Sequence, residues 1–70
     1  MTSKQLEILN YLKGKDWTGP TQIGLAFNKK YTSAPAWAIP ICMILVRDGL
    51  LERNQKGQYR IVENKHDTSM

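Results

Sequence analysis

The stretch that decides the fold is residues 45–61, LVRDGLLERNQKGQYRI. An apolar helix end runs into Gly49, which lets the chain reverse at a helix C-terminus. A short strand over 50–53 follows, then a turn over 54–57 whose last residue is glycine, as in a type I turn followed by a left-handed residue. Residues 58–62 alternate polar and apolar side chains, the period of a half-buried strand. The stretch therefore predicts a helix that leads directly into a β-hairpin.

Two shorter helices are expected before that helix. The first begins after Thr2, which has a glutamine three residues later in the capping-box arrangement, and its leucines and isoleucine fall mostly on one side. Trp17 follows in a short extended segment and is expected to be a core anchor. The second helix begins at Pro20, whose missing N–H suits the N1 position. Within it, Gly24 indicates close approach of another helix.

The third helix is expected from about Ala34 to Asp48, with Ser33 as its N-cap. Pro40 is a difficulty, because proline inside a helix removes one hydrogen bond and crowds the preceding turn, at a cost of about 3 kcal/mol. Either the helix kinks there, or its regular part begins nearer to Pro40.

Length and composition exclude several classes of protein. The chain has 70 residues with 41% hydrophobic and 23% charged side chains, which is ordinary for one small globular domain. Cys42 is the only cysteine and His66 the only histidine, so neither a disulfide framework nor a multi-cysteine zinc site is possible, and most triad enzymes are disfavoured. Cys42 is expected to be a buried hydrophobe. We expect no catalytic residue, metal or cofactor.

The net charge of +4 is unevenly distributed. Residues 29–60 carry a net charge of +4, against +1 for residues 1–28 and −1 for residues 61–70. A basic surplus of this size favours an anionic partner, although surface charge of this size can also serve only to keep a protein soluble.

Three helices followed by a hairpin resemble the winged helix-turn-helix family. The residues that carry the resemblance are 45–53 and GQYRI at 57–61, together with PTQIG at 20–24. They look like the family's junction between recognition helix and wing, and like the opening of its second helix. The resemblance implies an α+β fold and a DNA-binding protein of the bacterial or phage regulator type, located in the cytoplasm. It covers about residues 3–62.

The resemblance also implies which side chains would meet duplex DNA. Wing residues of this family contact the phosphate backbone, and the third helix enters the major groove. The candidate DNA contacts are Lys29, Lys30, Thr32, Ser33, Arg47, Arg53, Lys56 and Arg60. Three of these residues, Arg53, Lys56 and Arg60, lie on the expected wing. For them the alternative is that they are solvated strand charges without a partner.

The third helix departs from the family pattern. At 100° per residue its core face carries Ala38, Ile41, Cys42 and Leu45, while the opposite face carries Ala36, Ile39, Pro40, Met43 and Arg47. Only Arg47 on that opposite face is a hydrogen-bonding side chain, although base reading calls for polar groups. Three explanations compete: a second copy of the chain covers the face, another protein docks on it, or it enters the groove with Ala36 and Ile39 against thymine methyl groups. The candidate partner contacts are Trp37, Ile39, Met43 and Ile44.

The expected organisation is one winged-helix domain over residues 1–62 and a polar, disordered tail over 63–70. No apolar run approaches the ~20 residues of a membrane span, so no membrane association is expected. The function expected first is a transcriptional regulator or accessory factor that binds double-stranded DNA. The alternative is a protein-interaction or dimerisation module.

Overall fold

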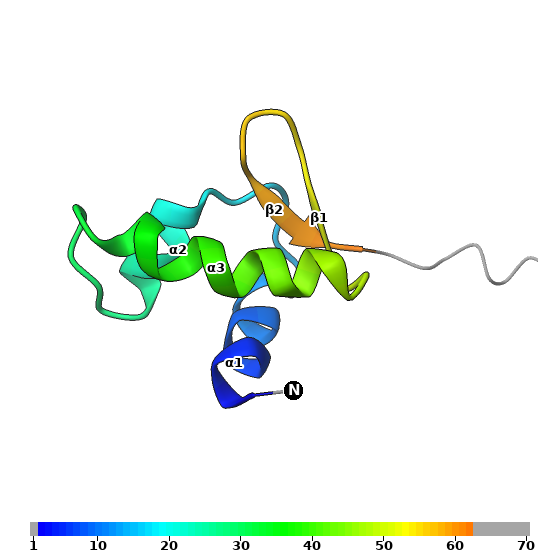
Figure 1. The fold of residues 1–70 in the computed structure, drawn as a ribbon, viewed down its shortest axis with the longest axis horizontal. Coiled ribbons are helices and arrows are strands. Elements are labelled where there is room, and N and C mark those ends of the chain that lie inside the picture. Colours follow the sequence, from blue (N-terminus) through cyan, green and yellow to red (C-terminus); the bar gives the residue numbers. More distant parts are fainter. Residues whose placement is uncertain (1, 63–70) are drawn as a thin grey trace, which may run out of the picture.

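The computed structural model describes residues 2–62 and contains three helices and a two-stranded hairpin. The elements are α1 (Ser3–Leu12), α2 (Pro20–Ala26), α3 (Ala34–Arg47), β1 (Leu51–Arg53) and β2 (Tyr59–Ile61). In Figure 1 the hairpin loop and α1 extend to opposite sides of α3, and α2 lies beside the N-terminal half of α3. The expected α+β fold with a C-terminal hairpin is confirmed, and its layout fits a winged helix. The tail expected over 63–70 lies outside the described residues.

The helix boundaries follow the expected local signals with two differences. The Gln5 backbone N–H donates to Thr2 Oγ1 at 3.2 Å and the Thr2 N–H donates to Gln5 Oε1 at 3.1 Å, so the capping box is present. Ser33 occupies the N-cap position of α3, but its hydroxyl makes no capping bond to the helix. Pro40 lies inside a helix that begins at Ala34, so the alternative of a later start is wrong.

The core is formed by one face of each helix and by both strands. Its fully buried residues are Ile8, Leu12, Ile23, Ala38, Cys42, Leu45, Leu51 and Tyr59. Leu6, expected on the apolar side of α1, is instead 50% exposed. The core residues of α3 all lie on one face of that helix, which leaves its opposite face outside the core.

At Gly24 the helices α2 and α3 approach each other closely. A Cβ atom placed on Gly24 would lie 2.6 Å from Ala34 Cα, which is closer than real Cβ contacts come. The expectation that this glycine marks close helix packing is confirmed. The contact fixes α3 against α2 at the start of α3.

The loop between α1 and α2 adds a third chain segment beside the hairpin. Strands β1 and β2 pair antiparallel with Leu51 opposite Ile61 and Arg53 opposite Tyr59. Thr18 forms a bridge to the other edge of β2, in which each backbone N–H donates to the other residue's carbonyl at 2.9 Å. This bridge ties β2 to the loop between α1 and α2, close to the turn of the hairpin.

Candidate nucleic-acid interface

The face of α3 turned away from the core is apolar and exposed. Cys42 and Leu45 are buried on the inner side, whereas Ile39 and Met43 are 39% and 42% exposed on the outer side. The residues expected on this outer face, Ala36, Ile39, Pro40, Met43 and Arg47, are all exposed. The helical-wheel prediction is therefore confirmed, and we call Ala36, Ile39, Pro40 and Met43 the apolar face.

The two other candidate partner contacts lie beside this face and differ from each other. Ile44 is exposed, whereas Trp37 is half-buried. The Trp37 ring packs on Phe27, with ring centroids 5.5 Å apart, and Phe27 in turn meets Tyr11 at 5.9 Å. Trp37 is thus held by an aromatic cluster that joins α1, the end of α2 and α3.

The loop before α3 presents cations and hydroxyls at the start of that helix. The Lys30 carbonyl accepts hydrogen bonds from the Ser33 N–H at 2.9 Å, the Ala34 N–H at 2.7 Å and the Ser33 hydroxyl at 3.4 Å. These bonds shape the turn that leaves Lys30, Tyr31 and Thr32 exposed. Lys29 is half-buried, with its Nζ atom 5.0 Å from the centre of the Trp37 ring.

Tyr31 is a candidate that the sequence reasoning missed. Its side chain is 72% exposed in this loop, between the two lysines and Thr32. An aromatic ring between cations is a pattern seen where proteins stack on the bases of single-stranded nucleic acid. The signal was present in the sequence as KKYTS at residues 29–33.

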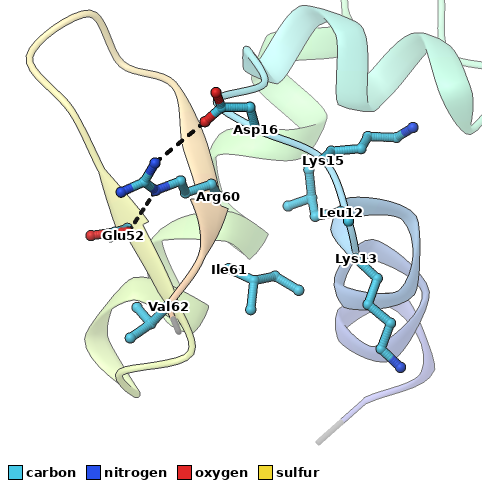
Figure 2. A pocket seen from close by; sticks show the side chains of 9 residues that line it. Leu12, Lys13, Lys15, Asp16, Glu52, Arg60, Ile61 and Val62 are labelled. Carbon is cyan, nitrogen blue, oxygen red and sulfur yellow. Dashed lines mark hydrogen bonds and ion pairs between the residues drawn. The ribbon is translucent and has the colours of Figure 1, made fainter. Parts of the chain in front are cut away.

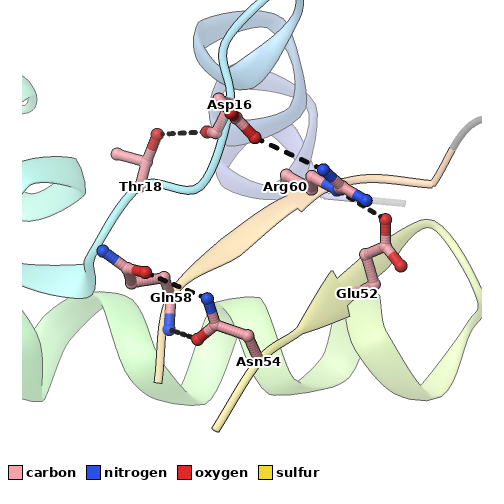
Figure 3. A network of polar contacts seen from close by, with 6 residues as sticks. All are labelled: Asp16, Thr18, Glu52, Asn54, Gln58 and Arg60. Carbon is pink, nitrogen blue, oxygen red and sulfur yellow. Dashed lines mark hydrogen bonds and ion pairs between the residues drawn. The ribbon is translucent and has the colours of Figure 1, made fainter. Parts of the chain in front are cut away.

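The wing turn is ordered by Asn54. Its Oδ1 atom accepts from the backbone N–H of Gln58 at 3.0 Å, and its Nδ2 atom donates to Gln58 Oε1 at 2.9 Å (Figure 3). The same Oδ1 atom accepts from the backbone N–H of Lys56 at 3.0 Å. Gly57 has a φ of 81°, the left-handed conformation expected at the end of this turn. The turn therefore holds Lys56 in a defined place at the tip of the hairpin.

Arg53 and Lys56 are the exposed cations of the wing. Side chains alternate along a strand, so Arg53 shares a face with buried Leu51, the face that packs toward α3. Within residues 2–62 neither Arg53 nor Lys56 forms an ion pair. Both cations therefore remain accessible to an anionic partner.

Arg60 differs from the expectation of an accessible wing cation. Its Nε atom donates to Glu52 Oε2 at 2.7 Å and its Nη1 atom donates to Asp16 Oδ1 at 3.3 Å (Figures 2 and 3). The guanidinium also lies over the Trp17 ring, 4.3 Å from its centre. The hydrogen bond to Glu52 raises the pKa of Arg60 above its ordinary value. Two carboxylates thus balance this charge, and Arg60 fastens the wing to the loop after α1.

Trp17 is not the core anchor that the sequence indicated. It is half-buried and lies outside the core cluster, with its ring under Arg60. The extended segment around it is present, because the next residue, Thr18, forms the bridge to β2. The hollow drawn in Figure 2 lies beside this network and is lined by Lys13 and Lys15 as well as by Asp16, Glu52 and Arg60.

Residues 2–62 also bear on metal binding and on membrane insertion. That part of the chain has no cluster of three or more His, Cys, Asp or Glu side chains that could hold a metal ion. None of its helices is both long and apolar enough to cross a membrane.

Comparison with protein-family models finds no match, and comparisons with curated proteins and with solved structures find no significant match.

The buried thiol gives the first prediction. Burial in the core raises the pKa of the Cys42 thiol from 9.0 to about 12. At about pH 8 only about one native molecule in 10⁴ therefore carries the reactive thiolate. We expect a disulfide reagent to label the folded protein far more slowly than the same protein in guanidinium. Equal rates would show that the thiol is accessible in the fold.

The same shift fixes the sign of a pH effect on stability. Above pH 9.0 the thiol of the unfolded chain loses its proton, while the folded chain keeps it until about pH 12. The unfolded state then binds fewer protons than the folded state, so the free energy of unfolding falls as the pH rises above 9.0. This contribution should be absent from Cys42→Ala.

Proposed function

We propose that this chain is a winged-helix domain that binds double-stranded DNA, with α3 in the major groove and the hairpin as a wing along the phosphate backbone. Its biological role would be that of a transcriptional regulator or accessory factor. The resemblance of residues 45–61 to the family's helix–wing junction gives the fold its context, and the arrangement of charge gives the function its support.

The observation that carries the proposal is that cations border α3 on three sides. Lys29 and Lys30 precede its N-terminus, Arg47 stands in its last turn, and Arg53 and Lys56 lie on the wing. Arg47 is only loosely engaged, because its Nε atom is 3.9 Å from Asp48 Oδ1 and both side chains are well exposed. A helix bordered by cations matches a groove bordered by two phosphate strands.

Arg60 is left out of the proposed contact set. Its charge is already balanced by Glu52 and Asp16, so it would release fewer counterions than an unpaired arginine on meeting a phosphate. Thr32 and Ser33 remain proposed contacts at the start of α3, where their hydroxyls can donate to phosphate or to base edges.

The salt dependence of binding tests the proposal. If about four of these cations meet phosphates, the logarithm of the association constant should fall with the logarithm of salt concentration with a slope of about −4. Fluorescence anisotropy with a labelled duplex measures this slope. Failure to bind any duplex at low salt would contradict the proposal.

The apolar face supports a second candidate, a module that pairs with another copy of the chain. Exposed apolar side chains gathered on one helix commonly mark protein interfaces. Sedimentation of the DNA-free protein separates the two readings. A monomer leaves α3 available to DNA, whereas a dimer abolished by Ile39→Glu with Met43→Glu would place these side chains between subunits.

A further inference from the structure

The middle of the exposed surface of α3 offers no side-chain hydrogen bond to a base. Ala36, Ile39, Pro40 and Met43 are all exposed, and none has a polar group in its side chain. Pro40 also lacks a backbone N–H. Direct reading of guanine, adenine or cytosine edges depends on hydrogen-bonding side chains. A helix with this surface therefore cannot identify bases through hydrogen bonds along its centre.

One feature of the major groove does match an apolar surface. Thymine presents its C5-methyl group there, while the other three standard bases present only hydrogen-bonding groups. We propose that the apolar face recognises pyrimidine C5-methyl groups, an inference that rests on the proposed function. The preferred sites then contain thymine at the positions opposite α3. The cations around the helix then supply affinity without base preference.

The charges around the apolar face favour a duplex over an apolar protein surface. Lys30 lies at one end of the helix, Arg47 at the other, and Arg53 and Lys56 on the neighbouring wing. Asp48, directly after the helix, is acidic, but its Oδ1 atom lies 3.9 Å from Arg47 Nε, so a cation stands beside it. An apolar strip with cations on its borders complements thymine methyl groups between two phosphate strands.

The length of the apolar face sets the size of the site. Residues 36 and 43 are seven positions apart, which is about 10 Å along a helix at 1.5 Å per residue. Successive base pairs are about 3.4 Å apart along the duplex, so the face covers about three of them. The preferred target therefore has a short run of A·T pairs under α3, with two or three methyl groups in contact.

The exposed side chains can be shortened without opening the core. Ile39 and Met43 lie outside the cluster of buried residues and their apolar neighbours. Ile39→Ala with Met43→Ala therefore removes contact surface while leaving the charges in place. Leu6→Ala with Val62→Ala is the matched control, because these residues are also exposed, at 50% and 36%, and lie outside α3.

The experiment compares four labelled duplexes of equal length by anisotropy. One pair has A·T base pairs with thymine or with deoxyuridine, and the other has G·C base pairs with cytosine or with 5-methylcytosine. Burial of one methyl group corresponds to about a fourfold change in affinity. Two or three such contacts therefore predict that the thymine duplex binds at least about tenfold more tightly than the uracil duplex. Methylated cytosine should likewise bind more tightly than cytosine.

The variants separate a contact with α3 from a property of the DNA. In Ile39→Ala with Met43→Ala the ratio of thymine-duplex to uracil-duplex affinity should fall toward one, because the side chains that contact the methyl groups are shortened. In the control double variant the ratio should be unchanged. If the ratio persists without Ile39 and Met43, the methyl effect does not come from α3 and the inference is overturned.

The remaining outcomes distinguish this inference from the proposed function. Equal wild-type affinity for thymine and uracil duplexes, with the expected salt slope, overturns methyl recognition and leaves DNA binding standing. Absence of binding to all four duplexes at low salt overturns both.

Discussion

Gly24→Ala is expected to unfold at a clearly lower urea concentration than the wild-type protein. The added Cβ would lie 2.6 Å from Ala34 Cα and 2.7 Å from the Ala34 carbonyl oxygen, and neither atom can rotate out of the way as the end of a side chain would. Overpacking of this kind costs about 1–3 kcal/mol. Alanine returns up to about 1 kcal/mol as the better helix former. Since the backbone must shift, we expect an overpacking cost near the upper end of that range, which leaves a net loss of about 2 kcal/mol after the gain from alanine.

A loss of this size is large for so small a domain. Native proteins are stable by about 0.05–0.15 kcal/mol per residue, which amounts to about 4–10 kcal/mol for a domain of this size. Far-UV circular dichroism during urea unfolding measures the change. Gly19→Ala is the control, because no atom lies within 4 Å of the added Cβ and the φ of −76° suits alanine. Equal midpoints for wild type and Gly24→Ala would show that α2 and α3 separate without cost.

Much of the fold could be predicted because its signals are local. The exposed face of α3 follows from the fixed rotation of 100° per residue once Gly49 marks the helix end. Gly57 adopts the left-handed conformation that its place in the turn predicts. The role of Gly24 could be predicted because glycine is a poor helix former, so its presence in a short helix indicates close packing. In the structure Ala34 occupies the space that a Cβ atom would need.

The contacts that were missed join residues far apart in the sequence. A single bridge between Thr18 and Tyr59 leaves no period-two pattern around Thr18, so nothing local predicts it. Arg60 and Asp16 are 44 residues apart, and nothing near Arg60 in the sequence reveals that second carboxylate. The charge of a cation can be counted from the sequence, but its availability depends on which carboxylates the fold brings beside it.

This distinction decides which basic residues carry the proposed interface. The total of +4 does not separate Arg60, which two acidic side chains engage, from Arg53 and Lys56, which have no acidic partner within residues 2–62. Arg60 fixes the wing in place, whereas Arg53 and Lys56 remain exposed. The sequence alone offers no reason to prefer one of these three cations as a DNA contact. With the fold in view, the proposed set of contacts omits Arg60.

The triple variant Lys30→Ala, Arg53→Ala, Lys56→Ala is expected to lose most of its affinity for duplex DNA. These are exposed cations at the start of α3 and on the wing. Removal of three phosphate contacts should change the salt slope from about −4 to about −1 and lower affinity about 10³-fold at about 50 mM salt. Anisotropy titrations at several salt concentrations measure both quantities, and far-UV circular dichroism confirms that the variant folds.

The matched control is Lys4→Ala, Lys13→Ala, Lys15→Ala, which removes the same charge from α1 and the loop after it. If binding depends on the cations around α3, the control keeps a slope close to that of the wild type, because these lysines belong to α1 and the loop after it and not to the start of α3 or the hairpin. If binding reflects only the net positive charge, both triple variants should weaken to a similar extent. That result would contradict the proposed interface, because the duplex would then be attracted without a defined orientation on α3 and the wing.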